Sequence, residues 1–158
     1  MKKRITIVGL GSGDEDQLTL GAIKALKRGY VILRTGDHGV VPFLEREGIS
    51  FITLDHVYES APSFEEAYAA MIGIILDKAE DQEVILAVPG HPMIGERLVL
   101  ELLSQLNQQD FQIDIVPGIG RAEAAMAAVG KYYDSQGIKI ITALDLDISH
   151  IDTDMTTL

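Results

Sequence analysis

The sequence predicts an α/β fold: a mostly parallel sheet with helices on both faces, followed by the start of a second α/β domain. Short apolar runs alternate with segments of helical period through most of the 158 residues. Such alternation favours strand–helix–strand units, which build parallel sheets covered on both sides. Turn signals separate the segments, and no repeat, low-complexity stretch or obvious linker interrupts them.

The first third of the chain alternates strand and helix twice. Residues 5–8 form an apolar run that is β-branched at each apolar position and ends at a glycine, which is typical of a buried strand. Residues 18–28 carry apolar side chains at helical spacing, and the glycine behind them predicts the end of a helix. We then expect a strand at 30–33, a short helix at 42–47 and a strand at 50–53.

The middle of the chain begins with a helix signal. Ser63 and Glu66 have the spacing of a capping box, in which the two residues satisfy each other's free backbone amides. A helix is therefore expected from this serine to about residue 80. Beyond it we expect strands at 83–88 and 112–116, helices at 95–108 and 121–129, and a strand or an extended loop at 138–143.

A domain boundary is expected near residue 117. Pro117, Gly118 and Gly120 place three turn signals between the fifth strand and the next helix. We therefore assign 1–116 to an N-terminal α/β domain and 117–158 to the beginning of a second one. Roughly 40 residues are too few for a stable core, so the second domain is expected to be truncated.

Composition excludes several classes of function. The formal net charge is −11 and the basic residues form no stripe, which disfavours nucleic-acid binding. No apolar run is long enough to span a bilayer or to form a signal-peptide core, so we expect a cytoplasmic protein without membrane contacts. Without cysteine there is no disulfide or thiolate chemistry. No metal site is expected, because metal-ligand spacing is absent among the four histidines, His38, His56, His91 and His150.

Three loops follow the carboxyl ends of predicted strands, where parallel sheets bind ligands. The first, 9–14, has Asp14 where the dinucleotide-binding fingerprint needs a glycine. The second, 88–95, holds two prolines and two glycines, with His91 at its apex. The third, 116–121, joins a rigid turn to a helix start, whose free amides favour a carboxylate. Each also has a purely structural interpretation: a tight turn, a hydrogen-bonded histidine, or a domain boundary.

Taken in order, these loops resemble the signatures of the tetrapyrrole (corrin/porphyrin) methylase family. Residues 9–14 match its G-x-G-x-G-D loop, Gly90-His91-Pro92 its G-D-P turn, and 116–119 its V-P-G-[IV] segment. The resemblance covers nearly the whole chain. It is closest to the branch fused to a MazG-type nucleotide pyrophosphohydrolase, through Arg34-Thr35, His38 and residues 89–93.

The resemblance implies S-adenosylmethionine as the cofactor, in a trough between two α/β domains of which the later one provides most of the adenine pocket. It further implies a small-molecule methyl acceptor, whose identity the sequence does not give, and a homodimer. The present chain is expected to bind the cofactor poorly and to be inactive alone. The implied cofactor-binding residues are Leu10, Gly90, His91, Met93, Ile94, Gly120, Arg121 and Ala122. The implied substrate-binding residues are Gly11, Gly13, Asp14 and Arg34.

Two features depart from the family pattern. His91 stands where the family has an aspartate, and a net charge of −11 suits a polycarboxylate substrate only if Arg34, Lys131 and Arg121 focus a local positive field. Methyl transfer from a sulfonium needs aligned reactants more than an acid–base pair. If a base is needed, His91 and Asp14 are the candidates.

Three functions stay open at this point. The first is an active S-adenosylmethionine-dependent methyltransferase. The second is a catalytically silent binding or regulatory domain fused to a MazG-type nucleoside triphosphate pyrophosphohydrolase, which His91 in place of aspartate favours. The third is an unrelated nucleotide-binding α/β protein, against which Asp14 argues because it replaces a glycine of the fingerprint.

Overall fold

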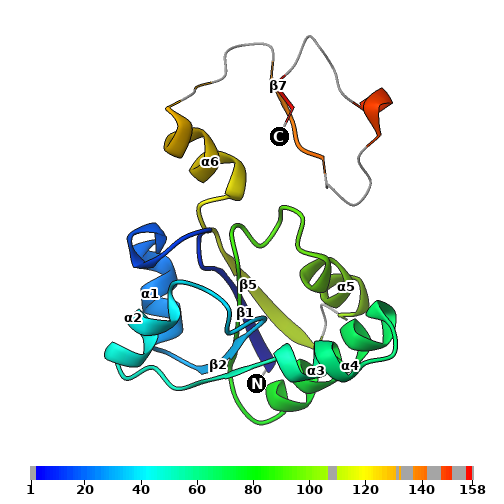
Figure 1. Cartoon of the computed structure of the whole chain (residues 1–158). Coiled ribbons are helices and arrows are strands. Elements are labelled where there is room, and N and C mark those ends of the chain that lie inside the picture. Colours follow the sequence, from blue (N-terminus) through cyan, green and yellow to red (C-terminus); the bar gives the residue numbers. More distant parts are fainter. Residues whose placement is uncertain are drawn as a thin grey trace. The chain divides into compact units, whose positions relative to one another are not determined.

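The computed structural model describes residues 3–106, 110–130, 132, 137–141, 147–150 and 156–157. The chain divides into two compact units, Met1–Gly120 and Arg121–Leu158. The first unit contains a five-stranded sheet with helices on both of its faces (Figure 1). Its elements are β1 (Lys3–Gly9), η1 (Glu15–Gln17), α1 (Leu20–Leu26), β2 (Tyr30–Leu33), α2 (Val41–Arg46), β3 (Phe51–Thr53), α3 (Asp55–Ser60), α4 (Phe64–Ala79), β4 (Val84–Val88), α5 (Arg97–Gln105) and β5 (Phe111–Val116).

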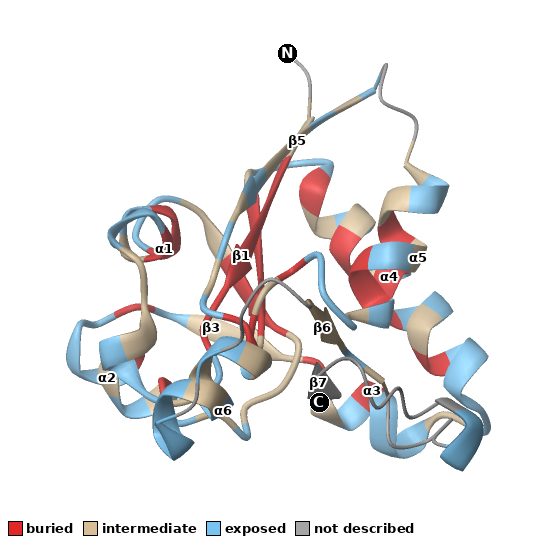
Figure 2. Ribbon diagram, turned by 90° about the horizontal axis from the view of Figure 1, so that it is seen from above, coloured by how far each residue is buried: buried red, intermediate tan, exposed pale blue. Residues whose placement is uncertain are grey.

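The sheet is parallel throughout, which confirms the predicted fold class. Its strand order is β3-β2-β4-β1-β5, and all four strand pairs run parallel. The helices face two separate cores. The core that includes Ile5, Ile7 and Leu86 packs against α4 and α5, whereas the core that includes Val8 and Ala87 packs against α1 and α2. Figure 2 shows these two helix groups on opposite sides of the buried strands.

The burial pattern of the central strand β4 follows from this two-sided cover. Successive side chains of a strand point to opposite faces, and in β4 both faces are covered, so all five of its residues are buried. The near-continuous apolar run that predicted β4 has this physical cause. The edge strand β5 has no fully buried residue.

The serine cap of the predicted capping box is present in the structure. The Ser63 hydroxyl oxygen accepts a hydrogen bond from the Glu66 amide at 3.2 Å and caps α4, which ends at Ala79. The helix predicted at 18–28 begins only at Leu20, because the Thr19 hydroxyl oxygen accepts from the Ala22 amide at 3.0 Å and acts as its cap.

Among the described residues of the first unit, one α-helix and the short 3-10 helix η1 were not predicted. α3 has six residues and buries only Val57, so it is too short to show a helical apolar period.

The two central strands mark a topological switch point. β1 and β4 are neighbours in the sheet, but β1 leads into α1 on one face and β4 leads into α5 on the other. Ligands of open α/β sheets bind outside the carboxyl ends of the strands at such a point. The topology therefore predicts that a ligand site lies at the loops after β1 and β4.

The second unit contains α6 (Arg121–Val129), β6 (Ile138–Lys139), η3 (Ile148–His150) and β7 (Thr156–Thr157). α6 has the predicted bounds, and β6 pairs in parallel with β7. Lys131 lies outside the described residues. The assignment of 117–158 to a domain that completes the cofactor site stays a prediction. Across the described part of both units, no helix combines the length and apolarity that a membrane span requires.

Candidate functional site

The loops after β1 and β4 are joined by a pair of hydrogen bonds between two glycines. The Gly11 amide donates to the Gly90 carbonyl oxygen at 3.3 Å, and the Gly90 amide donates to the Gly11 carbonyl oxygen at 2.6 Å. Both residues have positive φ angles, +74° and +69°, which favour glycine. Two sequence motifs separated by most of the unit thus form one antiparallel bridge.

The loop after β5 reaches the same place. A Cβ atom on Gly118 would lie 2.3 Å from the Gly90 carbonyl oxygen and 2.8 Å from Gly9 Cα. A Cβ atom on Gly9 would lie 2.6 Å from both the Gly118 nitrogen and the Gly90 oxygen. The three loops therefore touch main chain to main chain. We call this cluster of Gly9, Gly11, Gly90 and Gly118 the three-loop junction.

His91 stabilises the turn that follows the junction. Its Nδ1 accepts a hydrogen bond from the Met93 amide at 3.1 Å, and its carbonyl oxygen accepts from the Ile94 amide at 3.1 Å. A neutral His91 ring therefore carries its proton on Nε2. The side chains of Met93 and Ile94 are 55% and 45% exposed, so this rigid turn offers apolar surface to a ligand.

Asp14 has a local structural contact. Its carboxylate oxygen accepts from the Asp16 amide at 3.1 Å and caps η1. The neighbouring Ser12 amide donates to the Gln17 side-chain oxygen at 2.7 Å, which holds the same loop. Asp14 is exposed. The loop is thus ordered by its own side chains, with a carboxylate left facing solvent.

Three predicted cofactor residues are buried: Leu10, Gly90 and Gly120. The side chain of Leu10 is 1% exposed and packs in the core under α1 and α2, so a contact from Leu10 to a ligand would come from its main chain. Arg121 and Ala122 begin α6 in the second unit, and their place around a cofactor stays a prediction.

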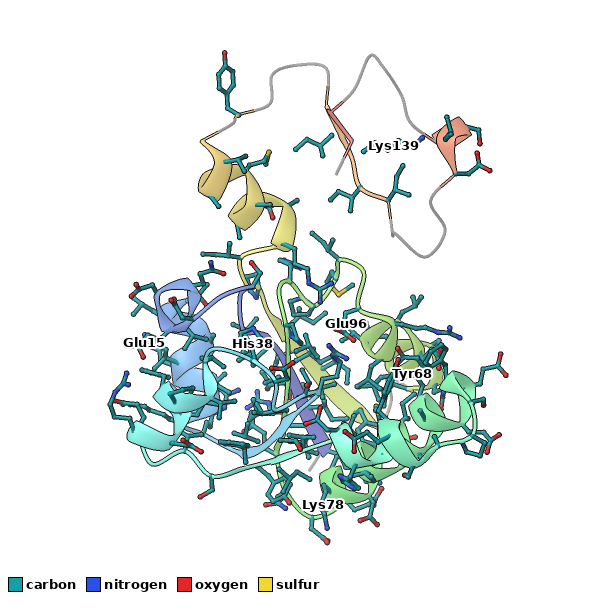
Figure 3. All side chains as sticks on the ribbon, viewed as in Figure 1. Glu15, His38, Tyr68, Lys78, Glu96 and Lys139 are labelled. Carbon is teal, nitrogen blue, oxygen red and sulfur yellow. The ribbon has the colours of Figure 1, made fainter. Side chains whose placement is uncertain are left out.

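Arg34, a predicted substrate residue, is engaged in an ion pair. Its Nε lies 3.3 Å from a carboxylate oxygen of Glu96, and the two side chains are 25% and 7% exposed. Among the described residues this buried nitrogen has no hydrogen-bond partner, and its contact with Glu96 is an ion pair. The pair links the end of β2 to the start of α5. An anionic substrate at Arg34 would have to compete with Glu96, which is labelled in Figure 3.

The loop after β2 is organised by Asp55. Its carboxylate accepts a hydrogen bond from the Gly36 amide at 2.7 Å. Burial would by itself raise the pKa of Asp55. The bonds from the Gly36 amide and from the hydroxyls of Thr35 and Thr53, with the charge of Arg34, outweigh burial and hold the pKa below its usual value.

Tyr68 of α4 lies in the electrostatic field of the Arg34–Glu96 pair. Burial raises the pKa of Tyr68, the charges of Tyr58 and Glu96 add to the rise, and those of Arg34 and Arg97 oppose it. The Arg97 guanidinium lies 5.3 Å from the centre of the Tyr68 ring. The phenol is therefore neutral near pH 7, because its ordinary pKa of about 10 is raised further.

Sequence reasoning missed three residues of this region. Asp55 and Glu96 were not singled out, and His38 was noted only for its resemblance. His38 Nε2 lies 3.0 Å from the Gly11 carbonyl oxygen, and Nδ1 accepts from the Val40 amide at 3.2 Å. The available signal was its position just after a predicted strand. Among the described residues, no group of histidine and carboxylate side chains is arranged to hold a metal ion.

A family model and two curated proteins match this chain. The model of the family described as Tetrapyrrole (Corrin/Porphyrin) Methylases matches residues 4–155. A Bacillus subtilis (strain 168) protein, named Uncharacterized protein YabN, is 37% identical over 119 residues, which are 75% of this chain and 24% of that protein. The cobalt-precorrin-4 C(11)-methyltransferase of Priestia megaterium is 28% identical over 133 residues, covering 79% of this chain and 46% of the enzyme.

A solved structure shows the same fold. The uroporphyrin-III-C-methyltransferase of Thermus thermophilus superposes with a TM-score of 0.66 at 21% identity, over 94% of this chain and 64% of that one. The chain spans about half the length, or less, of the curated relatives it matches. With a family model matching nearly its whole length and the loop signatures meeting at one switch point, the chain belongs to the tetrapyrrole (corrin/porphyrin) methylase family.

Proposed function

We propose that this chain is the cofactor-binding part of an S-adenosylmethionine-dependent methyltransferase of the tetrapyrrole methylase type. The observation that supports this most directly is the three-loop junction. Three glycine loops from separate parts of the chain meet main chain to main chain at the switch point of the sheet. Ligands bind at this edge in parallel α/β folds, and family membership supplies the class of reaction.

The charge and polarity of the surrounding loops suit this cofactor. Asp14 and Asp37 are exposed carboxylates on the loops after β1 and β2, and the chain carries a net charge of −11. A negative field attracts a sulfonium cation. The exposed side chains of Met93 and Ile94 offer apolar contact area beside the Gly90 main chain. The residues present therefore fit the cofactor chemically.

The role of this chain's residues is to hold and align. The bound cofactor supplies an electrophilic methyl group, which passes to a nucleophile of the acceptor while the bonding electron pair stays on sulfur. Alignment at about 3 Å accounts for much of the rate gain in such reactions. Loops held by main-chain contacts, as at Gly11, Gly90 and Gly118, give the rigidity that alignment needs.

We propose that the methyl acceptor is a small molecule of tetrapyrrole type. Relatives named for cobalt-precorrin-4 and uroporphyrin-III support that class. Because Arg34 is paired with Glu96, its charge is partly neutralised for acceptor carboxylates. We extend the proposal to a trough completed by a second α/β domain, to a homodimer and to a cytoplasmic location, as the resemblance implies.

The test is a calorimetric titration of S-adenosylmethionine into the full-length protein, which supplies the second domain, and into two glycine variants of it. Gly90→Ala introduces strain at φ +69° in the junction, and Gly48→Ala introduces the same strain at φ +68°, where a Cβ would meet nothing within 4 Å. We expect micromolar binding by the wild type, about −8 kcal/mol, a loss of at least roughly tenfold in Gly90→Ala, and no change in Gly48→Ala. Absence of binding by the folded wild type, or equal binding by both variants, contradicts the proposal.

A second candidate function is a catalytically silent domain that regulates a MazG-type pyrophosphohydrolase. The specific observation that favours it is His91 in the place of the family's aspartate. Because His91 Nδ1 is used within its own turn, the ring does not reproduce the two acceptor oxygens of a carboxylate. A folded protein that fails to bind S-adenosylmethionine, yet changes the rate of nucleoside triphosphate hydrolysis in a MazG fusion, would support this alternative.

A further inference from the structure

His38 uses both of its ring nitrogens to join two loops at the carboxyl edge of the sheet. Nδ1 accepts from the Val40 amide at 3.2 Å, within the loop between β2 and α2. Since Nδ1 is an acceptor, the neutral ring carries its proton on Nε2, which lies 3.0 Å from the Gly11 carbonyl oxygen and donates to it. His38 is half-buried and labelled in Figure 3.

The carbonyl that His38 contacts is the one that closes the junction. The same Gly11 oxygen accepts the Gly90 amide at 2.6 Å. A second contact joins the two loops, because a Cβ on Gly39 would lie 2.9 Å from the Gly13 carbonyl oxygen. The loop after β2 therefore supports the loop after β1 through one side chain and one main-chain contact.

We propose that His38 is a positioning residue for cofactor binding: through the Gly11 carbonyl it holds the Gly11–Gly90 bridge in the geometry that presents residues 90–94 to the cofactor. This inference rests on the proposed function, because it concerns the same site. His38 acts through Gly11 and is not itself a catalytic residue.

Histidine suits this role because its rigid ring offers an acceptor at the δ position and a donor at the ε position together. Asparagine reaches only the δ position and can keep the bond from the Val40 amide, as in an Asx turn. Glutamine reaches the ε position and can keep the donation to the Gly11 oxygen. The two substitutions therefore test the two hydrogen bonds of His38 separately. Asparagine keeps only the bond from the Val40 amide, and glutamine keeps only the bond to the Gly11 oxygen.

In the full-length protein, the experiment compares His38→Asn, His38→Gln and the control His56→Gln, which changes an exposed histidine of α3. Affinity for S-adenosylmethionine is titrated, and hydrogen exchange of the Gly90 amide is followed by NMR without cofactor. We expect His38→Asn to bind about fivefold more weakly, the equivalent of one net hydrogen bond, and to exchange the Gly90 amide faster. His38→Gln and His56→Gln should behave like the wild type in both measurements.

The outcomes separate this inference from the proposed function. Cofactor binding by the wild type together with equally tight binding by His38→Asn overturns the role of His38 and leaves the proposed function standing. If the folded wild type does not bind the cofactor, the proposed function is refuted. The role of His38 in cofactor binding is then refuted as well. If His38→Asn fails to fold, His38→Gln decides: wild-type affinity supports the bond to Gly11, and a loss in the folded variant overturns it.

Discussion

Gly118→Ala tests the close packing of the three-loop junction without adding backbone strain. Gly118 is not among the glycines with positive φ, so alanine is compatible with its backbone conformation. The effect of the substitution then comes from one methyl group. That methyl group would lie 2.3 Å from the Gly90 carbonyl oxygen and 2.8 Å from the Gly9 carbonyl carbon and Cα.

The expected loss of stability follows from what surrounds this methyl group. All three atoms belong to the main chain, which cannot rotate away as a flexible side chain would. Overpacking of this kind costs about 1–3 kcal/mol. Displacing Gly90 would also weaken its bond to the Gly11 oxygen, which adds about 1 kcal/mol. We therefore expect Gly118→Ala to lower the free energy of unfolding by about 2–4 kcal/mol.

Urea denaturation measures this change, and Gly73→Ala is the matched control. Gly73 is exposed in α4, and a Cβ there would meet nothing within 4 Å. The control should stabilise the protein by about 0.5–1 kcal/mol, because alanine is the better helix former. A Gly118→Ala variant that is as stable as the wild type would refute the main-chain contact between the three loops.

Two further predictions concern single hydrogen-bonding groups. Ser63→Ala removes the cap of α4 and should lower the free energy of unfolding, measured by urea denaturation, by about 1 kcal/mol. The control is Ser104→Ala, which removes a hydroxyl that donates to the Glu101 carbonyl oxygen within its own helix. This control should lower the free energy of unfolding less. Asp55→Asn should destabilise the protein at neutral pH, because the carboxylate accepts from the Gly36 amide and its folded-state pKa is lowered. This stabilising contribution is fully present above the unfolded-state pKa of about 4 and is lost as the pH falls through the lower folded-state pKa. Denaturation of both proteins at several pH values should show the stability difference shrinking toward acid, and a difference that stays constant would contradict the assignment.

The sequence predicted best those features whose cause lies within a few neighbouring residues. Ser63 and Glu66 predicted the start of α4 because an N-cap bond joins residues three apart. The apolar run of β4 predicted a strand buried on both faces. The start of α1 was placed two residues early, because Leu18 fits the apolar spacing of the helix but lies before the Thr19 cap in the structure.

Residues of the three-loop junction were singled out where a loop signature contained them, and their neighbours were missed where only spatial contact defined them. Gly11, Gly90 and His91 belong to signatures and lie at the junction or in the turn behind it. His38 was noted only as part of a branch resemblance, and its contact with Gly11 across 27 positions of the sequence was not predicted. The pairing of Arg34 with Glu96 could not be predicted, because charge in a sequence does not show which partner lies near.

By itself, the sequence determined the order and type of most elements, the parallel α/β class and the family resemblance. These depend on period, caps and loop composition, which are local along the chain. Only the tertiary structure decided the strand order β3-β2-β4-β1-β5, the bridge between Gly11 and Gly90, and the support that His38 gives to it. Crossover connections bring these groups together, and contacts between distant positions leave no periodic pattern in a single sequence.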